Sequence, residues 1–176
     1  MFGRRRRSEL EHVTRNAAGE FIYTGDWFVY SGTVPRKRLI CELWGLCGVA
    51  AVLLLVAGFL PAPGLIGCWY VQIPYVLSLG ALLTVLWALG RLTLAGEPIR
   101  ESVLYGAAQS LPRRLVLASV LSGLTAVCET LFLLSNREQN SLPLGIAFLA
   151  LSAVGCVALV LARLRISRMS WEEKQK

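Results

Sequence analysis

The sequence has little of what enzymes and metal proteins use for their chemistry. It contains a single histidine, His12, and five cysteines that form no CxxC pair, so neither a zinc site nor a disulfide framework is supported. It also has no recognisable Ser/His/Asp or Cys/His set and no glycine-rich phosphate-binding loop with its lysine. We therefore expect no enzyme, no metal and no cofactor.

Acidic residues are also scarce, because 11 Asp and Glu face 18 Lys and Arg, which leaves a net charge of +7. Such an excess can indicate nucleic-acid binding, but here the positive residues flank apolar blocks and form no stripe on a polar face. With 55% hydrophobic residues, this arrangement is typical of charges that set the topology of a membrane protein. We expect no nucleic-acid partner.

A secretory signal peptide is not indicated either. The polar stretch between the arginines at 4–7 and the first apolar block is too long, and no convincing small-residue cleavage site follows. We therefore interpret residues 1–38 as a basic arm.

Four apolar blocks dominate the rest of the chain. Each is long enough to cross a hydrocarbon core of about 30 Å at about 1.5 Å per residue. A helix-breaking Pro61-Ala62-Pro63-Gly64 follows the first block. The sequence predicts an all-α membrane domain over 39–164, built as two helical hairpins with spans at about 39–60, 71–92, 115–134 and 142–162.

The basic residues predict the orientation of these spans. Seventeen of the eighteen Lys and Arg fall in the arm, in the connection between the second and third spans, or after the fourth span, and only Arg137 falls on the other side. This bias places both termini in the cytoplasm, including the tail at 165–176. We expect a multi-pass protein of a prokaryotic plasma membrane, in contact with the bilayer and with anionic lipid head groups at the cytoplasmic face.

Two segments outside the spans have patterns of their own. Aromatic and β-branched runs on both sides of Gly25 predict a short β-hairpin over 21–30. Its residues Trp27, Phe28 and Tyr30 either anchor the arm at the bilayer interface or dock a membrane-protein partner. In the connection, apolar residues at helical spacing predict an amphipathic helix over 97–111 on the inner leaflet, ended by Pro112.

Polar residues within the spans are the best candidates for a site, because their cost in hydrocarbon must be offset. Helical spacing places one polar and small-residue face of the third span inward. Tyr75 and Ser78 on the second span reach a similar depth and are candidate hydrogen-bond partners of Glu129. The inward face comprises Ser119, Ser122, Gly123, Ala126, Glu129 and Thr130.

Two interpretations of Glu129 remain open. It is either a structural glutamate, hydrogen-bonded or reached by Arg137, or a proton-coupling carboxyl group. Glu42, four residues after Arg38, is expected only to form an ion pair at the cytoplasmic edge. The sequence thus favours a non-enzymatic accessory or assembly subunit of a membrane complex. The alternative is a small proton-coupled transporter or channel that acts as a homo-oligomer and uses Glu129.

Overall fold

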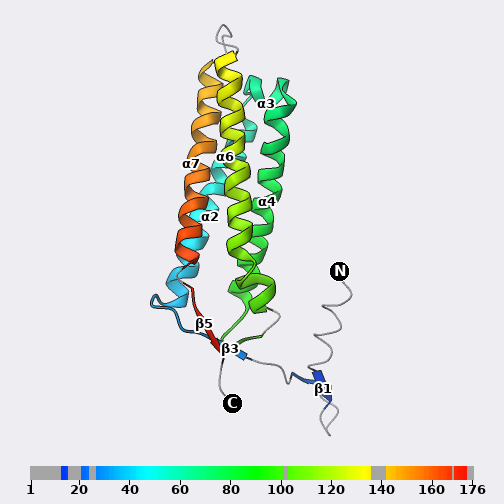
Figure 1. Ribbon diagram of the computed structural model, residues 1–176, viewed down its shortest axis with the longest axis vertical. Helices are drawn as coiled ribbons and strands as arrows, with labels where there is room; N and C mark the ends of the chain where they lie inside the picture. Colours follow the sequence, from blue (N-terminus) through cyan, green and yellow to red (C-terminus); the bar gives the residue numbers. More distant parts are fainter. Residues whose placement is uncertain are drawn as a thin grey trace.

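The computed structural model describes residues 13–15, 21–23, 27–100, 103–135, 142–167 and 169–173. The described chain contains four long helices. They form a bundle, as Figure 1 shows. Within the described residues all four are long and apolar enough to cross a membrane, which confirms the predicted class of four-helix, all-α membrane protein. They are α2 (Arg36–Phe59), α4 (Trp69–Leu94), α6 (Leu111–Ser135) and α7 (Leu142–Ile166).

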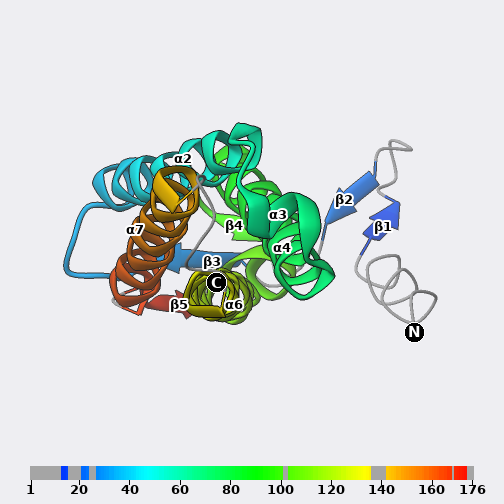
Figure 2. The same cartoon turned by 90° about the horizontal axis from the view of Figure 1, so that it is seen from above.

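Each helix extends a few residues beyond its expected span at one end or both, and α2 ends one residue earlier than expected, at Phe59. α2 packs on α7, α7 on α6 and α6 on α4, whereas α2 and α4 touch each other less. Figure 2, seen from above, shows this arrangement. Between α2 and α4 lies the short helix α3 (Pro63–Gly67), which begins with a proline at its first position, where the missing N–H costs least.

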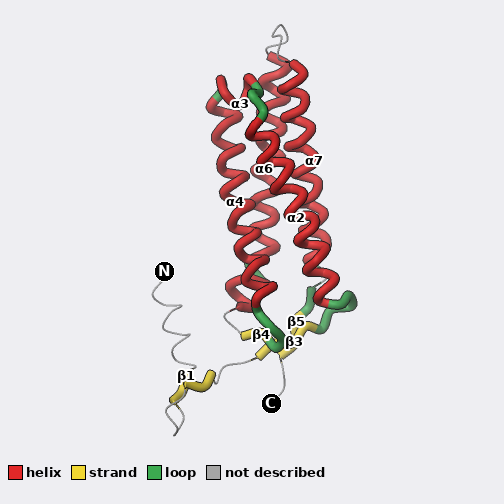
Figure 3. Tube along the Cα trace, turned by 180° about the vertical axis from the view of Figure 1, so that it is seen from behind, coloured by secondary structure: helices red, strands yellow, loops and turns green. Residues whose placement is uncertain are grey.

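The bundle has two different ends. At one end, called here the α3 end, lie α3, the last turn of α6 and the first turn of α7 (Figure 1). At the other, called the sheet end, short strands meet (Figures 1 and 3). They are β3 (Trp27–Tyr30), β4 (Ile99–Arg100) and β5 (Trp171–Glu173), in the antiparallel order β4-β3-β5. The sheet therefore joins segments from before α2, from between α4 and α6, and from after α7.

This sheet corrects the expected hairpin over 21–30. The strand β2 (Phe21–Tyr23) pairs instead with β1 (Val13–Arg15), and β3 pairs with β4 and β5. In β3, Phe28 lies opposite Ile99, which is buried under the helices. The pairing follows from packing, because β3 gains a buried apolar face against the bundle that a free two-stranded hairpin lacks.

The expected amphipathic helix over 97–111 is also wrong in its details. The connection contains β4 and one π-helical turn, η1 (Leu104–Ala108). Leu104, Ala107 and Leu111 are buried in the core under the helices and do not face the surface. Pro112 lies in the first turn of α6, where proline is tolerated, and therefore starts a helix where we expected it to end one.

The interior consists of two apolar clusters. The larger one fills the sheet end and the middle of the bundle, and the smaller one, which includes Tyr75, Phe132 and Phe148, fills the α3 end. The outer surfaces of the helices are apolar as well: Val52 is 60%, Leu83 67% and Leu131 58% exposed. Such a surface suits lipid and would be unfavourable in water.

Candidate functional site

Glu129 is the one acidic or basic residue buried within the described interior of the bundle. It lies on α6 near the α3 end and is 0% exposed. Neither of its carboxyl oxygens has a hydrogen-bond partner in the described chain. A buried carboxyl group without partners is costly, so its position requires an explanation beyond packing.

Two glycines allow the carboxyl group to fit. A methyl group added at Gly64 of α3 would collide with Oε2 of Glu129, and one added at Gly145 of α7 would lie 3.1 Å from Oε1. The carboxyl group is therefore held against the backbones of α3 and α7. Any side chain at Gly64 would have to displace it.

Residues of α3 also line an open pocket of about 530 Å³. Its lining includes Pro63, Ile66 and Gly67 of α3, together with Phe132 of α6. Gly64 thus lies against the carboxyl group of Glu129, while its neighbours in α3 line the pocket.

The expected partners of Glu129 are engaged elsewhere. Tyr75 Oη donates to the carbonyl of Leu54 at 2.8 Å, and Ser78 Oγ donates to the carbonyl of Tyr75 at 2.7 Å. The Tyr75 ring packs instead against Phe148, with centroids 5.7 Å apart. Arg137, the other suggested partner, lies outside the described residues.

The inward face of α6 is rotated from its expected position. Ala118, Ser122, Thr125, Glu129 and Phe132 are buried. Ser122 Oγ donates to the carbonyl of Ser152 on α7 at 3.2 Å. Thr130 is exposed and its hydroxyl donates to Ala126 of its own helix, so it does not belong with Glu129. Adjacent helical residues differ by about 100°, so Thr130 cannot share a narrow buried stripe with Glu129. Thr125, which we had not selected, takes its place.

The aromatic residues of β3 contact this chain itself. The guanidinium of Arg100 lies 5.8 Å from the ring centroid of Trp27, and the rings of Tyr30 and Trp171 meet edge to face at 5.5 Å. Phe28 packs against the larger apolar cluster. In this sheet only Val29 is an exposed large apolar side chain among the described residues.

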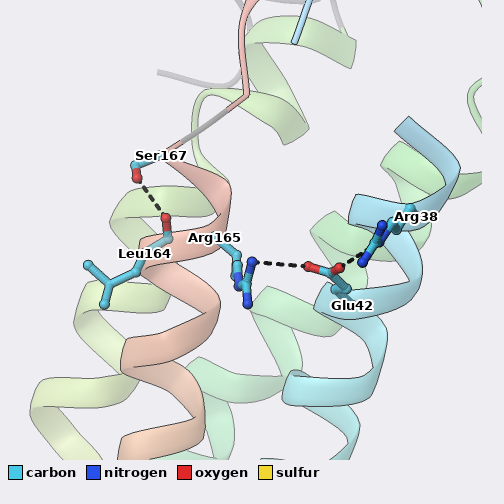
Figure 4. A network of polar contacts seen from close by, with 5 residues as sticks. All are labelled: Arg38, Glu42, Leu164, Arg165 and Ser167. Atoms are coloured by element: carbon cyan, nitrogen blue, oxygen red, sulfur yellow. Dashed lines mark hydrogen bonds and ion pairs between the residues drawn. The ribbon is translucent and has the colours of Figure 1, made fainter. Parts of the chain in front are cut away.

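Glu42 forms the expected ion pairs at the sheet end. Its Oε1 lies 3.2 Å from Nε of Arg38, and its Oε2 lies 3.7 Å from Nη1 of Arg165 on α7, as Figure 4 shows. A carboxylate bound on both sides by arginines fits an electrostatic link between α2 and α7, and it leaves no free group for chemistry.

Comparison with protein-family models, with curated proteins and with solved structures finds no match to this chain.

Proposed function

We propose that the chain is a non-enzymatic accessory or assembly subunit of a membrane complex, held in a prokaryotic plasma membrane with both termini in the cytoplasm. The observation that carries the proposal is the packed interior. From the sheet end to the middle of the bundle the core is continuous and apolar. The interior hydroxyls of Ser78, Ser122 and Thr125 donate to helix carbonyls, and that of Ser152 has no partner in the described chain. A conducting path needs polar groups in sequence, and the described interior offers an isolated carboxyl group.

The sheet supports the same proposal. Three distant segments converge at the end of the bundle that carries the basic residues, and they form an ordered surface next to the helices. Phe28 and Tyr30 pack against the bundle and Trp27 contacts Arg100, so Val29 is the side chain that β3 offers to a partner.

The test is purification of the chromosomally tagged chain in mild detergent. We expect one foreign membrane protein at a fixed ratio. Val29→Lys should reduce its recovery severalfold, whereas Thr33→Lys, at an exposed position just after the sheet, should leave it unchanged. Purification of the chain alone as a homo-oligomer would contradict the proposal.

The isolated carboxyl group supports a second candidate, a small proton-coupled transporter or channel. Buried carboxyl groups in membrane helices often mark proton sites, and Glu129 has no structural partner in the described chain. Purified protein in liposomes with a trapped pH-sensitive dye tests this. Transport requires proton flux that Glu129→Gln abolishes and that Thr130→Val, at the exposed neighbouring position, preserves. Liposomes that show no flux with the unaltered chain would exclude this candidate.

A further inference from the structure

The basic side chains at the sheet end divide into two groups. Three of them lie close to acids: Arg36 lies 3.5 Å from Glu97, and Arg38 and Arg165 share Glu42. On α4 and α6, Arg91 and Arg114 form no ion pair with the described chain. Arg91 and Arg114 are thus basic side chains that no described acid pairs with, as are Lys37 of α2 and Arg163 of α7.

Arg91 and Arg114 are held at fixed places on one surface. The guanidinium of Arg91 lies over the ring of Trp87, 5.1 Å from its centroid. Nη1 of Arg114 donates to the carbonyl of Thr84 on α4 at 2.9 Å. Thr84, Trp87 and Arg91 lie within about 60° on the helix surface at 100° per residue. Both cations therefore flank Trp87, whose side chain is 59% exposed, on the side of α4 next to α6.

The depth of these groups makes their charge costly. Arg91 and Thr84 lie about 5 Å and about 15 Å along the axis from the end of α4 at Leu94. A cation at such a depth needs a counter-charge or must reach the head-group region. Among the described acids, Glu42 and Glu97 are already paired, Glu129 lies at the α3 end, and the exposed Glu172 of β5 forms no ion pair with Arg91 or Arg114. The counter-charge must therefore come from outside the described chain.

We propose that Arg91, Arg114 and Trp87 bind the phosphate of an anionic phospholipid in the leaflet at the sheet end. Guanidinium groups match phosphate oxygens with paired hydrogen bonds, and tryptophan favours the head-group region. One turn beyond Thr84 on the same face, Gly80 leaves open space where a side chain would lie, and this space accommodates an acyl chain. The inference rests on the membrane location of the helices and is independent of the accessory role.

Native mass spectrometry of the full chain in mild detergent tests this site, with phosphatidylglycerol and phosphatidylcholine of identical acyl chains as probes. We expect retention of phosphatidylglycerol over phosphatidylcholine. Arg91→Gln with Arg114→Gln should weaken its binding about 30-fold, since each basic residue near an anionic head group contributes about fivefold. The charge-preserving pair Arg91→Lys with Arg114→Lys should lose less, and it keeps the test valid if the glutamine pair fails to fold.

The matched control is Lys37→Gln with Arg163→Gln, which removes the same charge at the sheet end from α2 and α7. It should change phosphatidylglycerol binding less than about threefold. If both pairs lost binding equally, the effect would come from net charge alone and the site would be overturned. Equal retention of phosphatidylcholine and phosphatidylglycerol would also overturn it.

Excess inorganic phosphate should not displace the lipid. Displacement would indicate a site for free phosphate and would overturn the lipid assignment. Loss of a protein partner in the purification above would leave these results unaffected.

Discussion

At the scale of single residues, the close approach of Gly64 to Glu129 is the contact most sensitive to substitution. Gly64→Ala should destabilise the bundle by about 1–3 kcal/mol, because the added methyl group displaces a carboxyl group already enclosed by α7. Thermal unfolding in detergent micelles measures the change. The matched control is Gly67→Ala in the same helix, where an added methyl group meets nothing within 4 Å and should cost little.

A double-substitution cycle then isolates the contact. Because Glu129→Ala removes the group that the methyl collides with, Gly64→Ala should cost much less in that background. An unchanged cost would show that Gly64 acts through the backbone of α3 and not through the carboxyl group.

Tyr30 offers a pH-dependent test outside the membrane-spanning helices. Its hydroxyl is buried without a hydrogen-bond partner in the described chain, and burial raises its pKa above the ordinary value of 10.0. A raised pKa in the folded state means that the unfolded chain loses this proton first. The contribution of Tyr30 to stability is therefore complete below about pH 10 and is lost as the pH rises above it.

Tyr30→Phe should be neutral or slightly stabilising at pH 8, because it removes a buried hydroxyl without a partner. Above pH 10 it should reduce the loss of stability with pH, as followed by circular dichroism unfolding curves. An identical pH dependence in both proteins would contradict the expected burial of this hydroxyl.

Residue periodicity predicted the burial of Glu129 but not its surroundings. The 3.6-residue repeat of α6 is a local property, so Ser122 and Glu129 could be assigned inward from the sequence. The rotation that buries Thr125 and exposes Thr130 depends on how α4 and α7 press on α6. The hydrogen bond from the Tyr75 hydroxyl to the carbonyl of Leu54 on α2 also depends on how the helices pack together. The hydrophobic repeat of one helix does not by itself determine its contacts with another helix.

At the scale of elements, the spans were predictable and the strand pairing was not. An apolar run of about 20 residues bounded by charges or prolines predicts a spanning helix from local information. β3 was expected to pair with the adjacent segment across Gly25, because a sequence reveals turns between neighbouring segments more readily than pairing between distant ones. Its actual partners, β4 and β5, lie far along the chain, so no local sequence signal points to them.

The sheet should therefore depend on the contact between Tyr30 and Trp171. Trp171→Ala removes this edge-to-face pair and part of the cover over the larger apolar cluster, at a cost of about 1 kcal/mol. Limited proteolysis of the protein in detergent should then cut faster around residues 31–35, where the chain leaves the sheet. Val29→Ala, in the same sheet but exposed, serves as the control and should leave the cleavage rate unchanged.

At the scale of the whole molecule, the position of the sheet and the distribution of basic residues both bear on the membrane topology. Four spans return the chain to the side from which it entered, and β3, β4 and β5 indeed meet at one end. Most basic residues belong to the same end, and positive charge is retained in the cytoplasm. In a variant lacking native cysteines, Gly67→Cys at the α3 end should therefore react with an impermeant maleimide in intact cells. Thr33→Cys at the sheet end should react only after the membrane is permeabilised, and the reverse pattern would invert the proposed orientation.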